Sequence, residues 1–186
     1  GMRLAGVDTV LFDMDGTMID SMGHHRLSWI EFARRHAIDI EVEDLMRRTT
    51  GRTGAECMNE LFGREFSRAE SWALIDEKER IYRDLFAPVF REVAGFRAFA
   101  ASARSRGLGI GVGTAGDRHN IAFALQHLAM DPPPHAIVGG DAIVGGDRSK
   151  CRRTDAIVGG DAIVGGDAIV GGDRFKSRRT DAIVGG

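Results

Sequence analysis

The stretch VLFDMDGTMID, residues 10–20, places two aspartates, Asp13 and Asp15, between an apolar run and a Gly-Thr pair. An uninterrupted apolar run of this length is typical of a buried strand in a parallel sheet, whereas a half-exposed strand would alternate apolar and polar residues. Ligands of doubly wound α/β folds bind beyond the carboxyl ends of such strands. We therefore expect both aspartates to lie at a binding crevice.

Further strands are predicted at 108–114, where apolar side chains alternate with glycine, and at 136–138. Segments with helical periodicity lie between the predicted strands. This alternation of strands and helices predicts an α/β fold with a doubly wound parallel sheet, that is, a Rossmann-like core. Residues 20–92 contain more helical pattern than one crossover needs. We interpret them as a separate helical cap inserted into a core made of residues 1–19 and 93–140.

The composition changes abruptly at residue 141. The unit DAIVGG occurs at 141–146, three times in tandem over 155–172, and again at 181–186. Identical repeats are unusual in a packed domain, because different core positions demand different shapes. The anomalous segment 141–186 favours a glycine-rich tail without fixed structure, or a duplicated, engineered or wrongly assembled sequence. A parallel β-helix is the third interpretation, but three tandem units are too few for a stable stack.

Charge and cysteine usage narrow the class of partner. The chain carries 25 basic and 27 acidic side chains, a formal net charge of -2, which gives no overall attraction to nucleic acid or to an acidic membrane. No window approaches the roughly 18 apolar residues of a membrane helix. The two cysteines, Cys57 and Cys151, lack the spacing of a zinc site and argue against a disulfide framework. We expect a soluble, cytoplasmic protein that acts on a small molecule.

The spacing of Asp13 and Asp15 suits phosphate chemistry. Side chains two positions apart in extended chain point to the same face, so both carboxylates can converge on one ligand. Such charges repel unless a cation bridges them or one is protonated, and Mg²⁺ is the usual cation beside a phosphate. One carboxylate can then attack phosphorus while the other exchanges a proton. Gly16 would permit a sharp turn, and Thr17 offers its hydroxyl or N–H to a phosphate oxygen.

The segment VLFDMDGTMIDS resembles the first motif of the haloacid dehalogenase-like hydrolase superfamily, in particular its β-phosphoglucomutase-like phosphatases and mutases. The resemblance implies an Mg²⁺-dependent phosphohydrolase that acts on a small phosphorylated metabolite, such as a sugar phosphate, through an aspartyl-phosphate. It implies that Asp13 is the nucleophile and a metal ligand. Asp15 would be the general acid/base and bind the metal through its main-chain carbonyl, with Thr17 in a supporting role.

The same resemblance extends to weaker matches along the chain. Thr114 of IGVGTAG matches the residue that ends the second motif, and Ala115 would lend an N–H to phosphate. Arg52 in TTGRTG resembles a cap arginine that contacts substrate in some members. His24 or His25 occupies the region where relatives have a histidine near the hinge.

The resemblance fails beyond roughly residue 140. The third-motif lysine of the family has no Gly-Lys-Pro counterpart here, and Lys150 is the nearest candidate. The fourth motif, an acidic pair that completes the metal site, has no match. Two alternatives therefore stay open: a phosphomutase, and a catalytically impaired relative that binds phosphate without turnover.

A dinucleotide-binding module is an alternative of a different class. GVGTAG, residues 111–116, satisfies the G-x-G-x-x-G pattern after a strand and before a helix. The pattern follows the second strand rather than the first, and Asp131 lies in a proline-rich turn instead of ending the next strand. These departures favour the phosphohydrolase interpretation.

Overall fold

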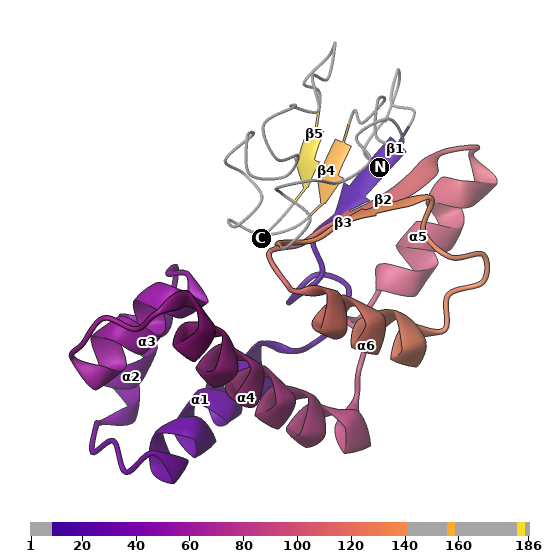
Figure 1. Ribbon diagram of the computed structural model, residues 1–186. Helices are drawn as coiled ribbons and strands as arrows, with labels where there is room; N and C mark the ends of the chain where they lie inside the picture. Colours follow the sequence, from indigo (N-terminus) through magenta and orange to yellow (C-terminus); the bar gives the residue numbers. More distant parts are fainter. Residues whose placement is uncertain (1–8, 141–155, 159–181, 185–186) are drawn as a thin grey trace. The chain divides into compact units, whose positions relative to one another are not determined.

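The computed structural model describes residues 9–140, 156–158 and 182–184 (Figure 1). The chain divides into two compact units. Residues Gly1–Asp20 and Arg91–Gly186 form the first, which we call the α/β unit, and Ser21–Phe90 form the second, the helical unit. The chain therefore passes between them twice.

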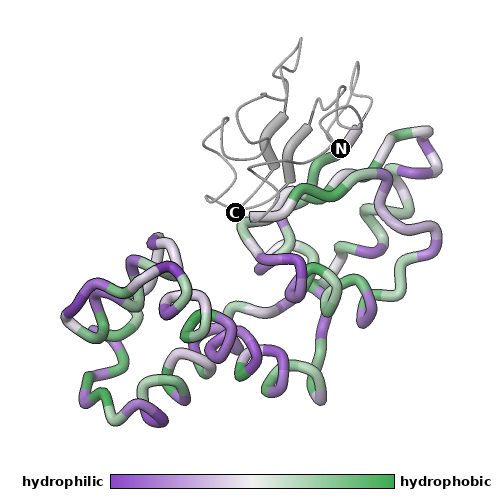
Figure 2. Tube along the Cα trace, viewed as in Figure 1, coloured by the Kyte–Doolittle hydropathy of each residue, from purple (hydrophilic) through white to green (hydrophobic). Residues whose placement is uncertain are grey.

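Parallel strands form the α/β unit. Strand β1, Thr9–Phe12, pairs with β2, Gly109–Gly113, which pairs in turn with β3, Ala136–Val138. The last three residues of β1 are buried, as the uninterrupted apolar run predicted, and Figure 2 shows this strand as hydrophobic. The predicted strands and the parallel α/β fold are confirmed.

Two short strands from the repeats extend the sheet beyond β1. Strand β4, Ala156–Val158, pairs with β1, and β5, Ala182–Val184, pairs with β4, so the described order is β3-β2-β1-β4-β5. These two strands were not predicted from the sequence. The apolar, β-branched sequence AIV suits a strand, and pairing satisfies the backbone groups on the second edge of β1. The other residues of the repeats lie outside the described residues.

Two helices connect the first three strands. Helix α5, Phe96–Ser105, leads into β2, and α6, Arg118–Leu128, leads from β2 to β3. Both connections run in the same direction across the sheet, so right-handed crossovers put both helices on one face. Phe12 of β1 packs edge-on against Phe96 and Phe99 of α5, with ring centroids 5.2 and 5.8 Å apart.

The helical unit consists of α1, Met22–Arg35, α2, Val42–Thr49, α3, Gly54–Phe62, and α4, Arg68–Phe86, followed by the 3-10 turn η1, Ala87–Val89. Hydrophobic and hydrophilic residues alternate along these helices (Figure 2), as expected of helices that bury one face.

Helices α1, α3 and α4 meet around one buried cluster in the helical unit, formed by Phe32, Met58 and Ile81. This unit thus has a hydrophobic core of its own. Among the described residues, no helix combines the length and the apolar composition needed to span a membrane.

Candidate active site

The acidic loop begins where β1 ends. Asp13 is buried, with 7% of its surface exposed, and its Oδ1 accepts a hydrogen bond of 2.8 Å from the N–H of Met14. Gly16 has φ of +75°, a left-handed conformation that favours glycine, and its N–H donates to the carbonyl of Ile19 at 2.8 Å. The chain therefore turns sharply between Asp15 and Thr17, as the Gly-Thr pair predicted.

A second buried hydroxyl-bearing residue lies at the end of β2. Thr114 is 7% exposed, and its N–H donates to the carbonyl of Val138 at 2.9 Å. Its Oγ1 accepts a hydrogen bond of 3.0 Å from the N–H of Gly116. Ala115, between them, is exposed. The loop after β2 is thus held in place on both sides of Ala115.

The strand register brings the two loops to the same edge of the sheet. Phe12 pairs with Val112 in the parallel ladder between β1 and β2. Asp13 and Thr114 follow these residues at the carboxyl ends of adjacent strands, where doubly wound folds bind ligands. Of the predicted site residues, Asp13, Asp15 and Thr17 therefore share this edge with Thr114 and Ala115.

Gly140, which sequence reasoning did not single out, supports this edge from β3. Its N–H donates to the carbonyl of Gly116 at 2.9 Å. A Cβ at position 140 would lie 2.2 Å from the carbonyl oxygen of Ala115, a distance that no side chain tolerates. The only sequence signal was the Gly-Gly pair after the third strand. The loops after β2 and β3 thus pack backbone against backbone.

The donor atoms at the end of β1 suit a hard cation. Asp13 can provide carboxylate oxygens and Asp15 a main-chain carbonyl oxygen, and oxygen atoms of these kinds are the ligands that Mg²⁺ prefers. Within the part of the chain that the structure describes, however, no group of three or more His, Cys, Asp or Glu side chains could hold a metal ion. The described residues therefore fit Mg²⁺ in donor type but do not by themselves form a metal site.

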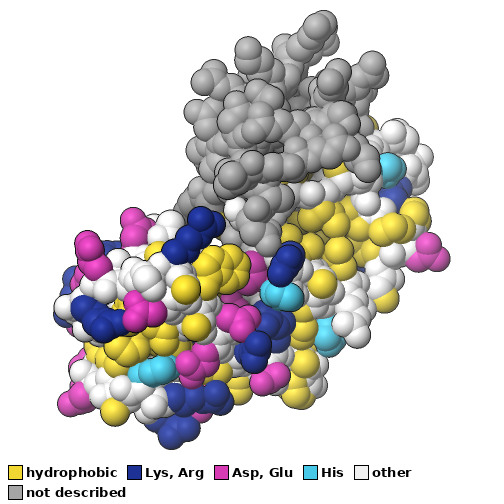
Figure 3. Space-filling model, in the orientation of Figure 1, with side chains coloured by type: hydrophobic (Ala, Val, Ile, Leu, Met, Phe, Trp, Pro, Cys, Tyr) yellow, Lys and Arg dark blue, Asp and Glu magenta, His cyan; other side chains and the backbone are white. Residues whose placement is uncertain are grey.

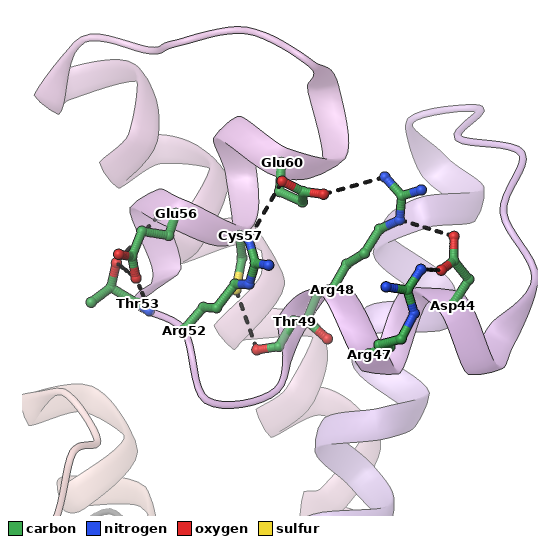
Figure 4. Close-up of polar contacts among 9 residues, drawn as sticks. All are labelled: Asp44, Arg47, Arg48, Thr49, Arg52, Thr53, Glu56, Cys57 and Glu60. Carbon is green, nitrogen blue, oxygen red and sulfur yellow. Dashed lines mark hydrogen bonds and ion pairs between the residues drawn. The ribbon is translucent and has the colours of Figure 1, made fainter.

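The remaining predicted residues lie elsewhere. Arg52 belongs to the helical unit, in the loop between α2 and α3, and its side chain is 44% exposed. Its Nη1 lies 3.4 Å from Oε2 of Glu60 (Figure 4). Lys150 lies outside the described residues.

Lys78 is a buried cation that sequence reasoning missed. It lies on α4, is 3% exposed, and its Nζ is 3.1 Å from Nδ1 of His25 and 3.1 Å from Oε1 of Glu79. The same atom lies 4.9 Å from the centroid of the Trp29 ring, in cation-π geometry. A lysine this deeply buried is rare without partners. Its position three residues before the buried Ile81, on the apolar face of the helix, was the available signal.

Cys57 has no features of a nucleophile. Its Sγ lies 3.4 Å from the carbonyl oxygen of Thr49, to which the thiol donates (Figure 4). Burial raises the pKa of the Cys57 thiol to about 11. The thiol therefore stays protonated near neutral pH.

A cavity of about 260 Å³ in the helical unit contains none of the predicted site residues. Charged side chains of both signs line it, and Figure 3 shows such mixed charges across the helical unit. The lining residues are Arg35, Ala73, Asp76, Glu77, Arg80, Ile81 and Asp84. We place the candidate site at the sheet edge because the buried Asp13 and Thr114 follow the carboxyl ends of two adjacent strands there.

The chain has a parallel sheet, an acidic loop after β1, and a buried threonine at the end of the neighbouring strand. These features are typical of the α/β proteins that bind a ligand at the strand ends. The sequence profile of the haloacid dehalogenase-like hydrolases matches residues 7–151. The chain belongs to this hydrolase family, as the first motif indicated.

Individual relatives agree with this assignment. The chain is 28% identical over 137 residues to β-phosphoglucomutase of Bacillus subtilis (strain 168), a match that covers 69% of this chain and 59% of that protein. The chain therefore matches less than two thirds of the length of this relative.

Two solved structures share the fold. A HAD hydrolase of family IA, variant 3, from Entamoeba histolytica superposes with a TM-score of 0.74 at 21% identity, covering 96% of this chain and 83% of that one. CbbY from Rhodobacter sphaeroides, solved in complex with phosphate, has a TM-score of 0.67 at 18% identity, covering 96% and 93%.

Proposed function

We propose that the chain is an Mg²⁺-dependent phosphohydrolase that acts on a small phosphorylated metabolite through an aspartyl-phosphate. The observation that carries the proposal is the buried Asp13 carboxylate at the carboxyl end of β1, one strand away from the buried Thr114. Membership of the haloacid dehalogenase-like hydrolases and the phosphate bound to the structurally similar CbbY support it.

In this mechanism Asp13 is the nucleophile. One of its carboxylate oxygens attacks phosphorus, the bond from phosphorus to the ester oxygen breaks, and Asp15 donates a proton to the departing oxygen. Water then attacks the phosphorus of the aspartyl-phosphate, giving its proton to Asp15 and releasing inorganic phosphate. The bond between phosphorus and the Asp13 oxygen breaks in this second step, so the two steps together return Asp13 and Asp15 to their starting states.

Groups of the two neighbouring loops would hold the phosphoryl oxygens. Thr114 can donate its hydroxyl, Ala115 its N–H, and Thr17 its hydroxyl, since the N–H of Thr17 already donates to the carbonyl of Met14 at 3.3 Å. These donors suit the charge that develops on the equatorial oxygens during phosphoryl transfer. Arg52 as a substrate contact and Lys150 as the lysine of the third motif stay predictions.

Asp13 and Asp15 are the residues that would hold Mg²⁺. The ion would neutralise the charge that the phosphate brings close to the two carboxylates. Asp13 is only 7% exposed, so little water can reach its carboxylate and screen this charge in place of the ion.

A phosphomutase is the second candidate, because the relative from B. subtilis is a β-phosphoglucomutase. The first step is the same in both reactions, and the acceptor differs. Water accepts the phosphoryl group in a phosphatase, whereas a sugar hydroxyl accepts it in a mutase. With a sugar monophosphate, ³¹P NMR separates the two activities: a phosphatase releases inorganic phosphate, and a mutase forms a positional isomer.

Hydrolysis of p-nitrophenyl phosphate tests the proposal directly. We expect Mg²⁺-dependent turnover by the unmodified chain, loss of turnover when EDTA removes the metal, and a decrease in kcat of at least about 10³-fold in Asp13→Asn, which lacks the nucleophile. Asp39→Asn, at an exposed position of the helical unit, is the matched control and should retain full activity.

Two outcomes would count against the phosphohydrolase. Equal activity in Asp13→Asn and the unmodified chain would remove Asp13 from the mechanism. A folded chain that binds inorganic phosphate but does not hydrolyse the ester would instead support the alternative of a catalytically impaired relative.

A further inference from the structure

The loop after β2 lies against the acidic loop at a glycine. Gly116 ends the G-x-G-x-x-G pattern of residues 111–116, for which the proposed phosphohydrolase gives no reason. A Cβ at position 116 would lie 3.3 Å from Cε of Met14 and 3.2 Å from Oγ1 of Thr114. Both distances are shorter than an ordinary van der Waals contact, so a side chain here would displace one of these neighbours. The last glycine of the pattern therefore leaves the space that Met14 occupies.

Met14 connects this contact to the proposed nucleophile. Its side chain is only 2% exposed, and its N–H donates a hydrogen bond of 2.8 Å to Oδ1 of Asp13. Its carbonyl oxygen accepts hydrogen bonds from the N–H of Met18 at 2.9 Å and from the N–H of Ile19 at 3.2 Å. Met14 thus orients the Asp13 carboxylate, closes the turn that follows, and places its methyl group beside the neighbouring loop.

Hydrogen bonds hold Gly116 on its other sides. Its N–H donates to Oγ1 of Thr114 at 3.0 Å, and its carbonyl accepts from the N–H of Gly140 at 2.9 Å. Because Oγ1 of Thr114 accepts this bond, its hydroxyl proton can point away from Gly116, toward a bound phosphoryl group. A shift of Gly116 would therefore move the hydroxyl of Thr114 and the N–H of Ala115, the two groups that we expect to bind phosphate.

We propose that Met14 is a positioning residue of the phosphoryl-transfer site. Its side chain fills the space between the acidic loop and Gly116, and it thereby sets the separation between the Asp13 carboxylate and the groups that hold the phosphoryl oxygens. Reacting atoms must lie about 3–3.5 Å apart, and a displacement of about 1 Å can lower a rate about 10²-fold. The inference rests on the proposed function, and it adds a residue that acts through Asp13 and the loop after β2 rather than on the substrate.

Truncation of this side chain tests the positioning role. We expect Met14→Ala to lower kcat for p-nitrophenyl phosphate by about 10- to 10²-fold and to change KM by less than about threefold, because the bound ester is held at the wrong distance for attack. Met14→Leu conserves the volume of the side chain and should keep kcat within about threefold of the unmodified chain.

Leu128→Ala is the matched control for a loss of buried volume. Leu128 is also 2% exposed, and it ends α6, which starts after the loop that follows β2 and runs for 11 residues, roughly 15 Å, away from it. This variant should unfold at lower urea concentration and keep the kcat of the folded enzyme. A decrease in kcat no larger in Met14→Ala than in Leu128→Ala, or an equal decrease in Met14→Leu and Met14→Ala, would overturn the positioning role.

The contact between the loops is tested by adding Gly116→Ala. In the unmodified chain the new methyl group meets Cε of Met14, whereas in Met14→Ala only the contact with Thr114 remains. We therefore expect Gly116→Ala to lower kcat/KM by a factor at least about threefold larger in the unmodified chain than in Met14→Ala, and to lower the urea midpoint more as well. If the unmodified chain hydrolyses no ester, the proposed function fails and the midpoints decide: unequal losses support the contact, and equal losses overturn it.

Discussion

At the scale of single residues, the predicted chemistry depends on the close approach of two loops. The carbonyl of Ala115 occupies the space where a side chain of residue 140 would begin. The N–H of Gly140 meanwhile donates to the carbonyl of Gly116. Any side chain at position 140 must therefore displace the segment that we expect to bind phosphate.

We predict that Gly140→Ala destabilises the α/β unit by about 1–3 kcal/mol, the usual cost of overpacking, and raises the KM for p-nitrophenyl phosphate. Gly23→Ala is the matched control, because a Cβ at this exposed helical position meets nothing within 4 Å. It should be neutral or stabilising by about 0.5–1 kcal/mol. Urea unfolding and steady-state kinetics of both variants provide the measurement, and equal effects of the two substitutions would contradict the prediction.

At the scale of secondary-structure elements, α4 carries charged residues on both an exposed and a buried face. Arg80 is 70% exposed and pairs with Asp76 one turn away, as a solvated helix face predicts. Lys78, two residues earlier, faces α1 instead, where it meets His25 and Trp29. The charge pattern of the segment IDEKER was therefore no guide to which basic residue is buried.

The two basic residues should consequently differ in their contribution to stability. Lys78→Met removes a buried cation from His25 and Glu79, and we expect a loss of about 1–3 kcal/mol. Arg80→Met removes one exposed ion pair and should change the free energy of unfolding by no more than about 0.5 kcal/mol. Urea unfolding followed by tryptophan fluorescence measures both, and a smaller loss in Lys78→Met than in Arg80→Met would refute the assignment.

At the scale of the whole molecule, the division into two units makes stability a property of each unit. Both tryptophans, Trp29 and Trp72, lie within Ser21–Phe90. Their fluorescence therefore reports on the helical unit, whereas the far-ultraviolet circular dichroism reports on helices in both units.

We predict that fluorescence and circular dichroism give different unfolding midpoints, because each unit has its own core. Lys78→Met should shift the fluorescence transition, and Gly140→Ala should shift only the component seen by circular dichroism. Coincident curves in the unmodified chain, with both variants shifting them equally, would show a single cooperative unit instead.

Local sequence was sufficient to predict part of the fold and the motif of the candidate site. An apolar run followed at once by DMDGT determined the position of β1, its burial and the turn at Gly16. The family followed from the same residues, because a strand end and a tight turn depend on neighbours in sequence. The alternation of later patterns was sufficient to predict β2, β3 and the parallel sheet.

Tertiary structure decided the features that join distant parts of the chain. Four such features join residues from different elements. They are the pairing of β4 with β1, the burial of Lys78, the position of Glu60 between two arginines, and the contact of Gly140 with Ala115. Hydrophobic periodicity and charge pattern depend only on the residues within one segment. They do not say which other segment those residues contact in the folded chain. The motif of the candidate site was thus visible in sequence, whereas its supporting contacts became visible only in three dimensions.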